Sequence, residues 1–182
     1  MALSTITNKV KVYNPYALYV TPWTSETTKG SATYLLDEVI RDSTTITQED
    51  PTENKIENEF SSAPIINPVT LGSYTFSAEV ADMSPELLNI LCGYTLDTDK
   101  EKAYAPSTYA PLYAEIALVF QATGGTYIAA ILPKVQLNSK ATLDSLSSSM
   151  GRITLAGTGL NASIDGKTTP FVIDTKYELP TE

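Results

Sequence analysis

The chain has 182 residues, of which 42% are apolar and 18% charged, and its formal net charge is −9. This length and composition predict one folded domain over residues 1–182 and exclude a disordered chain. The acidic balance argues against ordinary nucleic-acid binding, which needs clustered Lys and Arg to neutralise phosphates. The absence of histidine and the single cysteine, Cys92, exclude Ser–His and Cys–His catalysis and an intrachain disulfide.

Residues 1–30 are expected to form an N-terminal arm, because prolines follow Asn14 and Thr21 and Lys29-Gly30 marks a turn. The start of the chain, MALSTITNKV, lacks a basic stretch followed by a long apolar core, so we expect no secretory signal. The longest apolar run, Tyr127 to Leu132, is too short to cross a bilayer. These features predict a protein that folds in a cytoplasm and does not insert in a membrane.

The segment from Asp37 to Phe60 concentrates the charge, with eight acidic and two basic side chains. Its pattern predicts a strand from Tyr34 to Ile46, a turn from Gln48 to Thr52 around Pro51, and a return strand from Glu53 to Phe60. We therefore expect a β-hairpin with a dense carboxylate face.

Residues 73–80 alternate polar and apolar side chains and predict a half-buried strand. A helix is predicted directly after it, at residues 84–92. Ser84 is typical of an N-cap, Pro85 of the first helical position and Gly93 of a left-handed C-terminal cap. Because so short a helix is unstable alone, we expect it to flank a sheet.

The second half of the chain is predicted to be mostly strand. After a loop at residues 94–112, Tyr113 to Gln121 and Thr126 to Leu132 form an almost wholly apolar hairpin, buried on two faces or pressed against another molecule. Residues 161–182 are expected to form a C-terminal arm. Further strands are expected at residues 134–138, 151–160 and 170–174. The fold class predicted is mainly β, a β-sandwich or open barrel of about eight or nine strands with one short flanking α-helix.

The acidic side chains offer few chemical roles. Glu53, Glu57 and Glu59 are the candidates for a glycoside-hydrolysing carboxylate pair, but one solvated strand face explains them better. The LDTDKEK motif at residues 96–102 is similar to the start of a calcium loop but lacks the required glycine. We therefore expect a protein that is not an enzyme, with no catalytic residue, no metal site and no cofactor.

Tyrosine is abundant, with 11 residues. Such side chains cap the edges of a β core or anchor interfaces and sugar sites, because they combine a large contact area with a polar end. An alternative function is therefore a carbohydrate-binding or adhesive β-sandwich. Its stacking platforms would be Trp23, Tyr104, Tyr109 and Tyr113.

The order of motifs resembles a known family. The acidic segment DSTTITQEDPTENKIENEF is followed by a strand, the helix SPELLNILCG, an apolar hairpin with a Gly-Gly tip, and SSSMGRITLAGTGL. In this order and residue texture, residues 32–160 resemble the major tail tube proteins of long-tailed bacteriophages, which are related in fold to type VI secretion tube proteins. The resemblance implies a β-sandwich or barrel that assembles as hexameric rings, stacked into a hollow tube, and it implies no active site.

A role follows from this resemblance. It implies a structural protein of the virion tail, assembled in the bacterial host cytoplasm, through which DNA passes without specific binding. The implied partners are further copies of the chain and the tape-measure, tail-terminator and distal tail proteins.

Two groups of residues are candidates for the contacts of such a tube. The first would line the lumen or contact the next ring, two alternatives that the sequence leaves open: Glu49, Asp50, Glu53, Lys55, Glu57 and Glu59. The second would form the subunit interface, because strand addition turns exposed edges into assembly surfaces: Tyr113, Ile116, Leu118, Phe120, Tyr127, Ile128 and Ile131.

Overall fold

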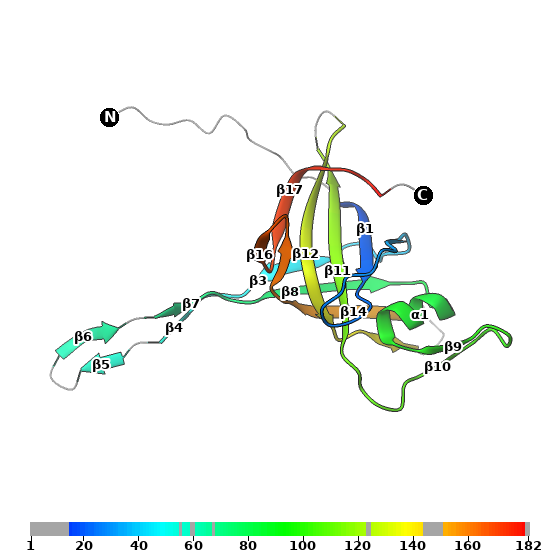
Figure 1. The fold of residues 1–182 in the computed structure, drawn as a ribbon, viewed down its shortest axis with the longest axis horizontal. Helices are drawn as coiled ribbons and strands as arrows, with labels where there is room; N and C mark the ends of the chain where they lie inside the picture. Colours follow the sequence, from blue (N-terminus) through cyan, green and yellow to red (C-terminus); the bar gives the residue numbers. More distant parts are fainter. Residues whose placement is uncertain are drawn as a thin grey trace.

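The computed structural model describes residues 15–54, 56–58, 61–66, 68–122, 125–143 and 151–180. For residues 56–58 and 61–66 it describes the backbone only. Seven strands form a continuous antiparallel sheet in the order β2-β1-β11-β12-β14-β8-β3 (Figure 1). Two more strands join this sheet at its side, where β17 pairs with β12 and β13 pairs with β14. The described part of the sheet does not close into a barrel. The predicted fold class, mainly β with one short helix, is confirmed.

The strands of this sheet are short at its two ends and long at its centre. They are β1 (Pro15–Pro22), β2 (Tyr34–Leu36), β3 (Thr45–Gln48), β8 (Tyr74–Val80), β11 (Leu112–Gln121), β12 (Tyr127–Leu137), β13 (Lys140–Thr142), β14 (Arg152–Gly159) and β17 (Val172–Tyr177). Four two-stranded ladders complete the fold: β4 (Thr52–Glu53) with β7 (Val69–Thr70), β5 (Ile56–Asn58) with β6 (Ser61–Ile66), β9 (Thr95–Asp97) with β10 (Lys102–Tyr104), and β15 (Ala162–Ile164) with β16 (Lys167–Thr169).

Strand β12 divides the sheet into two parts. One of its edges pairs with β11, and the other pairs with β17 over residues 127–131 and with β14 over residues 135–137. Pro133 lies where the partner changes, so its missing N–H breaks no ladder bond. This explains why the strand continues through Pro133 instead of restarting at Lys134 as predicted. The strands β14, β8 and β3 consequently run across the direction of β11, β12 and β17 (Figure 1).

The helix α1 (Pro85–Cys92) lies beside the sheet, as predicted (Figure 1). The Ser84 hydroxyl accepts a hydrogen bond from the Leu87 N–H, and Gly93 ends the helix in the left-handed conformation. The buried side chains of this helix are Leu87, Leu88 and Leu91, and they join the main core between the two parts of the sheet.

The β11–β12 hairpin is buried on both faces by its own chain. Ile116 and Leu132 point into the main core and are fully buried. Ala117, Val119, Ala129 and Ile131 form a second core on the other face. Side chains of β15 and β17 cover this second core. Residues 161–180, which were expected to form an arm, thus include three strands of the folded body.

The acid-rich segment forms a hairpin, but the turn is not where the sequence placed it. Strands β3, β4 and β5 run outward and β6, β7 and β8 return, paired as β3–β8, β4–β7 and β5–β6 (Figure 1). The predicted turn at residues 48–52 is wrong, because Pro51 falls between two ladders where its missing N–H is not needed. The predicted strand at residues 34–46 is confirmed only at its two ends, in β2 and at the start of β3. Between them, residues 37–44 carry one isolated bridge, from Val39 to Val80.

The projecting part of this hairpin, residues 49–73, is named the arm here. At its root the Glu49 N–H donates to the Ser73 carbonyl over 2.9 Å, and the Ser73 hydroxyl donates to the Glu49 carboxylate. The two backbones approach so closely that a Cβ on Gly72 would lie 1.9 Å from the Glu49 carbonyl oxygen. Gly72 therefore allows the arm to leave the sheet as a continuous ribbon.

Substitution Gly72→Ala should separate the two strands at the root of the arm, because neither backbone can yield without losing the Glu49–Ser73 bond. Overpacking of this kind costs about 1–3 kcal/mol. We expect the Glu49 amide to exchange hydrogen at least about tenfold faster, measured by NMR. The control is Gly166→Ala, whose Cβ would meet no heavy atom within 4 Å but whose positive φ of 76° strains the β15–β16 turn; this strain lies outside the arm and should leave the Glu49 amide unchanged. Unchanged exchange in Gly72→Ala would contradict the prediction.

Candidate assembly surfaces

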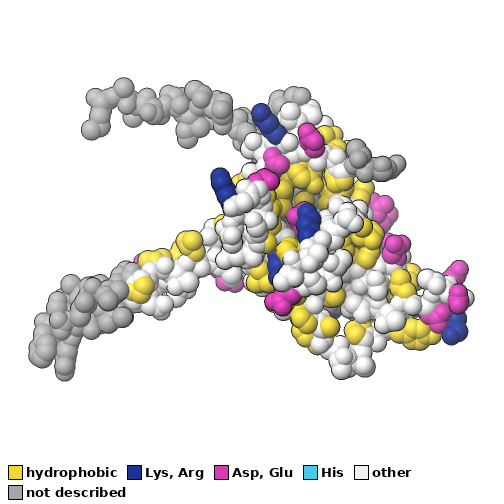
Figure 2. All heavy atoms as spheres, viewed as in Figure 1, with side chains coloured by type: hydrophobic (Ala, Val, Ile, Leu, Met, Phe, Trp, Pro, Cys, Tyr) yellow, Lys and Arg dark blue, Asp and Glu magenta, His cyan; other side chains and the backbone are white. Residues whose placement is uncertain are grey.

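The arm exposes apolar and acidic side chains together. Val69 and Leu71 are 55% and 77% exposed, and they lie two positions apart, which places them on one face of an extended strand. The side chains described at residues 49–54 and 68–73 include three acids, Glu49, Asp50 and Glu53, and no base. Apolar side chains are visible along this part of the arm in Figure 2.

Three of the six residues predicted to line a lumen or to contact another ring thus lie on the described arm. They are Glu49, Asp50 and Glu53. The other three, Lys55, Glu57 and Glu59, lie outside the residues whose side chains the structure describes. The acidic pattern in the sequence therefore identified a segment that projects from the sheet, although it did not identify Val69 and Leu71.

The residues predicted to form a subunit interface lie mostly inside the subunit. The buried ones are Ile116, Leu118, Ile128 and Ile131. Tyr127 stacks at a tilt on Tyr16, with ring centroids 5.0 Å apart, and Phe120 packs against the main core. The chain's own β15, β17 and main core thus occupy the faces on which the sequence placed a second copy. The apolar pattern could not distinguish these two ways of covering the hairpin.

Lys134 lies against two aromatic rings, that of Trp23 and that of Tyr113, the remaining interface candidate. The Lys134 Nζ atom lies 4.4 Å from the ring centroid of Tyr113 and 5.1 Å from that of Trp23. It also donates to the Glu26 carbonyl over 2.6 Å. One face of each ring is therefore used within the fold. Of the four proposed stacking platforms, Tyr104 and Tyr109 remain exposed.

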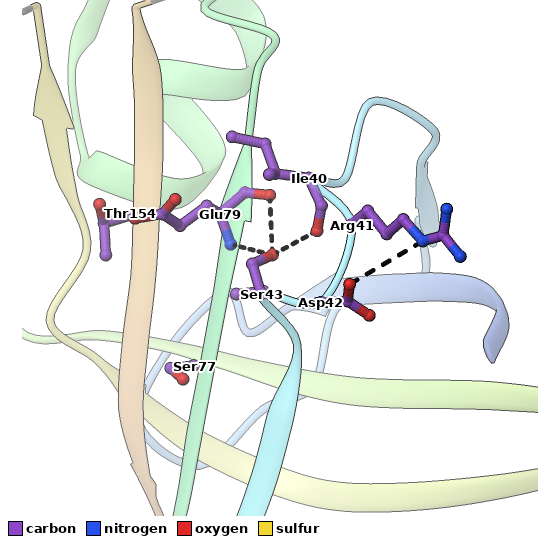
Figure 3. Close-up of a pocket in the computed structure, with 8 residues that line it drawn as sticks. Ile40, Arg41, Asp42, Ser43, Ser77, Glu79 and Thr154 are labelled. Atoms are coloured by element: carbon purple, nitrogen blue, oxygen red, sulfur yellow. Dashed lines mark hydrogen bonds and ion pairs between the residues drawn. The ribbon is translucent and has the colours of Figure 1, made fainter. Parts of the chain in front are cut away.

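One hollow of about 380 Å³ lies beside β8 and β14, at the end of β3 that is opposite the arm (Figure 3). Ser43 Oγ donates to the Ile40 carbonyl over 2.6 Å and accepts from the Glu79 N–H over 3.0 Å. Arg41 and Asp42 approach each other to 3.9 Å in open solvent, where an ion pair contributes little. The Ser43 hydroxyl thus stabilises the turn that precedes β3. Among the described residues, no basic group accepts a hydrogen bond from it and could activate it.

A second hollow, also about 380 Å³, is a groove between α1, residues 105–110 and the β12–β13 connection. Its lining is Leu91, Cys92, Gly93, Tyr94, Ala105, Pro106, Tyr109, Ala110, Leu112, Leu137, Asn138, Ser139, Lys140 and Ala141. Lys140 is the single charged residue among these. Burial raises the pKa of the Cys92 thiol to about 11, so this cysteine stays protonated at neutral pH and is a poor nucleophile.

Metal-binding groups do not gather in the part of the chain that the structure describes, since no three His, Cys, Asp or Glu side chains come together there. In the LDTDKEK segment, which was not expected to bind calcium, Asp97 accepts a hydrogen bond from Lys100 over 3.0 Å. No helix in the described ranges has the length and apolar character needed to span a membrane.

Comparison with known proteins adds a distant likeness. No family model and no curated protein sequence matches the chain. Its fold is similar to that of a chain in the 6-fold symmetrised cryo-EM structure of the anti-feeding prophage baseplate. The TM-score is 0.41 at 11% identity, covering 95% of this chain and 97% of that chain. What this protein does must therefore follow from its own residues.

Lys134→Met should destabilise the fold, because it removes the charge held by Trp23 and Tyr113 and the hydrogen bond to the Glu26 carbonyl. We expect a loss of about 1–2 kcal/mol in the free energy of unfolding, measured by urea titration with Trp23 fluorescence. Lys167→Met, at an exposed position on β16, is the control and should change it by less than about 0.5 kcal/mol. Equal effects of the two variants would refute the proposed role of Lys134.

Alkaline pH should destabilise the protein through the half-buried phenol of Tyr177 and the thiol of Cys92. Burial, with Glu115 as the next cause, raises the pKa of Tyr177 above its ordinary value of 10.0. The native state then binds this proton more tightly than the unfolded chain does, so stability is retained below pH 10 and falls as pH rises beyond it. Cys92 adds a decline between pH 9 and about 11. Tyr177→Phe should make the fall above pH 10 shallower in urea titrations; an unchanged slope would contradict this assignment.

Proposed function

We propose that this protein is a structural subunit that polymerises with copies of itself, as a tail tube protein of a bacteriophage virion. In the family that the chain resembles, such subunits form hexameric rings stacked into a hollow conduit for DNA. The role would be non-enzymatic and would need no cofactor or metal.

The arm is the observation that carries this proposal. A two-stranded ribbon has no core of its own and is marginally stable in water. This one exposes Val69 and Leu71, and its outer edges are not paired within the described part of the chain. A thin ribbon that extends from a closed core is explained if another molecule covers it.

The partner that fits best is a second copy of the chain. The arm runs away from the sheet rather than along it (Figure 1), which supports contact with a neighbouring ring over lining of a lumen by Glu49, Asp50 and Glu53. The overall charge of −9 suits a conduit, because carboxylates repel the phosphate backbone and let DNA pass without adhering.

The place of assembly follows from this role. The subunit would polymerise in the bacterial host cytoplasm and remain in the virion tail. Tape-measure, tail-terminator and distal tail proteins would be its other partners, at the interior and the two ends of the tube.

Removal of the arm tests the proposal. Glu49 and Ser73 are hydrogen-bonded neighbours, so an Asn-Gly turn can replace residues 50–72 and close the hairpin at its root. We expect the shortened chain to fold but to remain monomeric, whereas the intact chain forms rings or tubes at high concentration. Circular dichroism, sedimentation velocity and negative-stain electron microscopy measure these properties.

The matched control is Asp165→Asn, which places the same Asn-Gly pair in the existing β15–β16 turn and leaves the arm intact. This variant should assemble as the intact chain does. An intact chain that stays monomeric at every concentration and salt condition would refute the proposal, as would assembly of the armless chain to the same extent.

A further inference from the structure

We infer that the groove between α1, residues 105–110 and β13 is the acceptor for the arm of a second copy. This inference rests on the proposed function, because it names the surface on which the arm would be covered. It defines the contact as one between two different surfaces of the same chain.

The groove is incomplete as it stands. Its base includes the buried side chains of Leu91 and Leu137 and the half-buried Leu112. Ser139 also lines it, and its Oγ atom is shielded from solvent without a hydrogen-bond partner among the described residues. A shielded hydroxyl without a partner is uncommon in native structures and indicates that a bonding group is missing.

The charge of the groove complements that of the arm. Lys140 is exposed on its rim, and none of the residues that line it is acidic. The described part of the arm offers the reverse, with three carboxylates and no base, beside Val69 and Leu71. An arm laid in the groove would place apolar side chains on the apolar base and a carboxylate near Lys140.

The other hollow lacks these features. Its volume is the same, but Ser43 is bonded to backbone groups on both sides. The basic residue that lines this hollow, Arg41, already lies near Asp42. Equal volume therefore does not make the two hollows equal candidates, and the unpaired hydroxyl and the free rim charge favour the groove at α1.

The position of the groove decides the kind of assembly. The helix α1, which forms one wall, lies at the opposite end of the molecule from the arm along its longest axis (Figure 1). An arm therefore cannot reach the groove of its own chain. A contact between two different surfaces repeats from copy to copy, so it generates a ring or a filament and not a two-fold dimer.

Disulfide trapping tests this contact. In a Cys92→Ser background, Leu71→Cys places a thiol on the arm and Asn138→Cys places one on the exposed rim of the groove. Oxidation of assembled material should link each copy to the next and give a ladder beyond dimers on a non-reducing gel. The control pairs Leu71→Cys with Ile173→Cys, which is 62% exposed on β17, and should give no ladder.

A charge reversal provides a second measurement that does not depend on thiols. Lys140→Glu should raise the protein concentration needed for assembly by about tenfold, while Lys167→Glu on β16 should leave it nearly unchanged. Equal effects of the two reversals would refute the groove as the acceptor.

The outcomes separate this inference from the proposed function. Assembly seen by electron microscopy without a disulfide ladder, or with links only inside one chain, would overturn the groove contact and leave the structural role standing. Failure of the unmodified chain to assemble would overturn both.

Discussion

The fold depends on the β11–β12 hairpin, because it supplies all four buried side chains of the second core and many of those in the main core. Ile116, Leu132 and Val135 are fully buried in the main core, and Val119 and Ala129 are fully buried in the second. Burial of an Ile, Leu or Val side chain contributes about 1.5–3 kcal/mol. The chain uses most of this hydrophobic surface for itself, so we expect contacts with other molecules to be made mainly elsewhere.

Local signals in the sequence were sufficient for several elements. Ser84, Pro85 and Gly93 marked both ends of α1, and the alternation at residues 73–80 marked β8. In each case the information lies within a few residues, in a cap or in side-chain periodicity. The residue types also gave the mainly-β class and the apolar hairpin, although not what covers it.

Features that depend on distant partners could not be read in this way. Pro51 with its polar neighbours has the composition of a turn, but the pairing of β3 with β8 and of β4 with β7 carries the chain past it. The position of the true turn depends on register over the whole segment, not on local composition. Likewise, nothing near Val172 indicates that it pairs with Ile131 of β12.

The same distinction between local and long-range information applies to the residues of the candidate surfaces. A run of acids identified the segment of the arm, because charge density is visible in sequence. Leu71 and Ser139 were missed, since an isolated leucine before a glycine and a serine in a loop have no distinguishing pattern. Their importance arises from exposure in one case and from an unpaired buried hydroxyl in the other, and both are properties of the folded chain.

The composition of the arm also addresses the hazard of an exposed ribbon. Open strand edges pair with one another indiscriminately unless charge or proline prevents it. Glu49, Asp50 and Glu53 supply like charges that repel a second arm, and Pro51 and Pro68 each remove a backbone donor. Two such arms therefore repel each other. The groove at α1 has a lysine on its rim and no acid in its lining, so it does not repel an arm. In the proposed assembly, the same residues would keep free subunits from pairing arm to arm and would direct each arm to the groove of another copy.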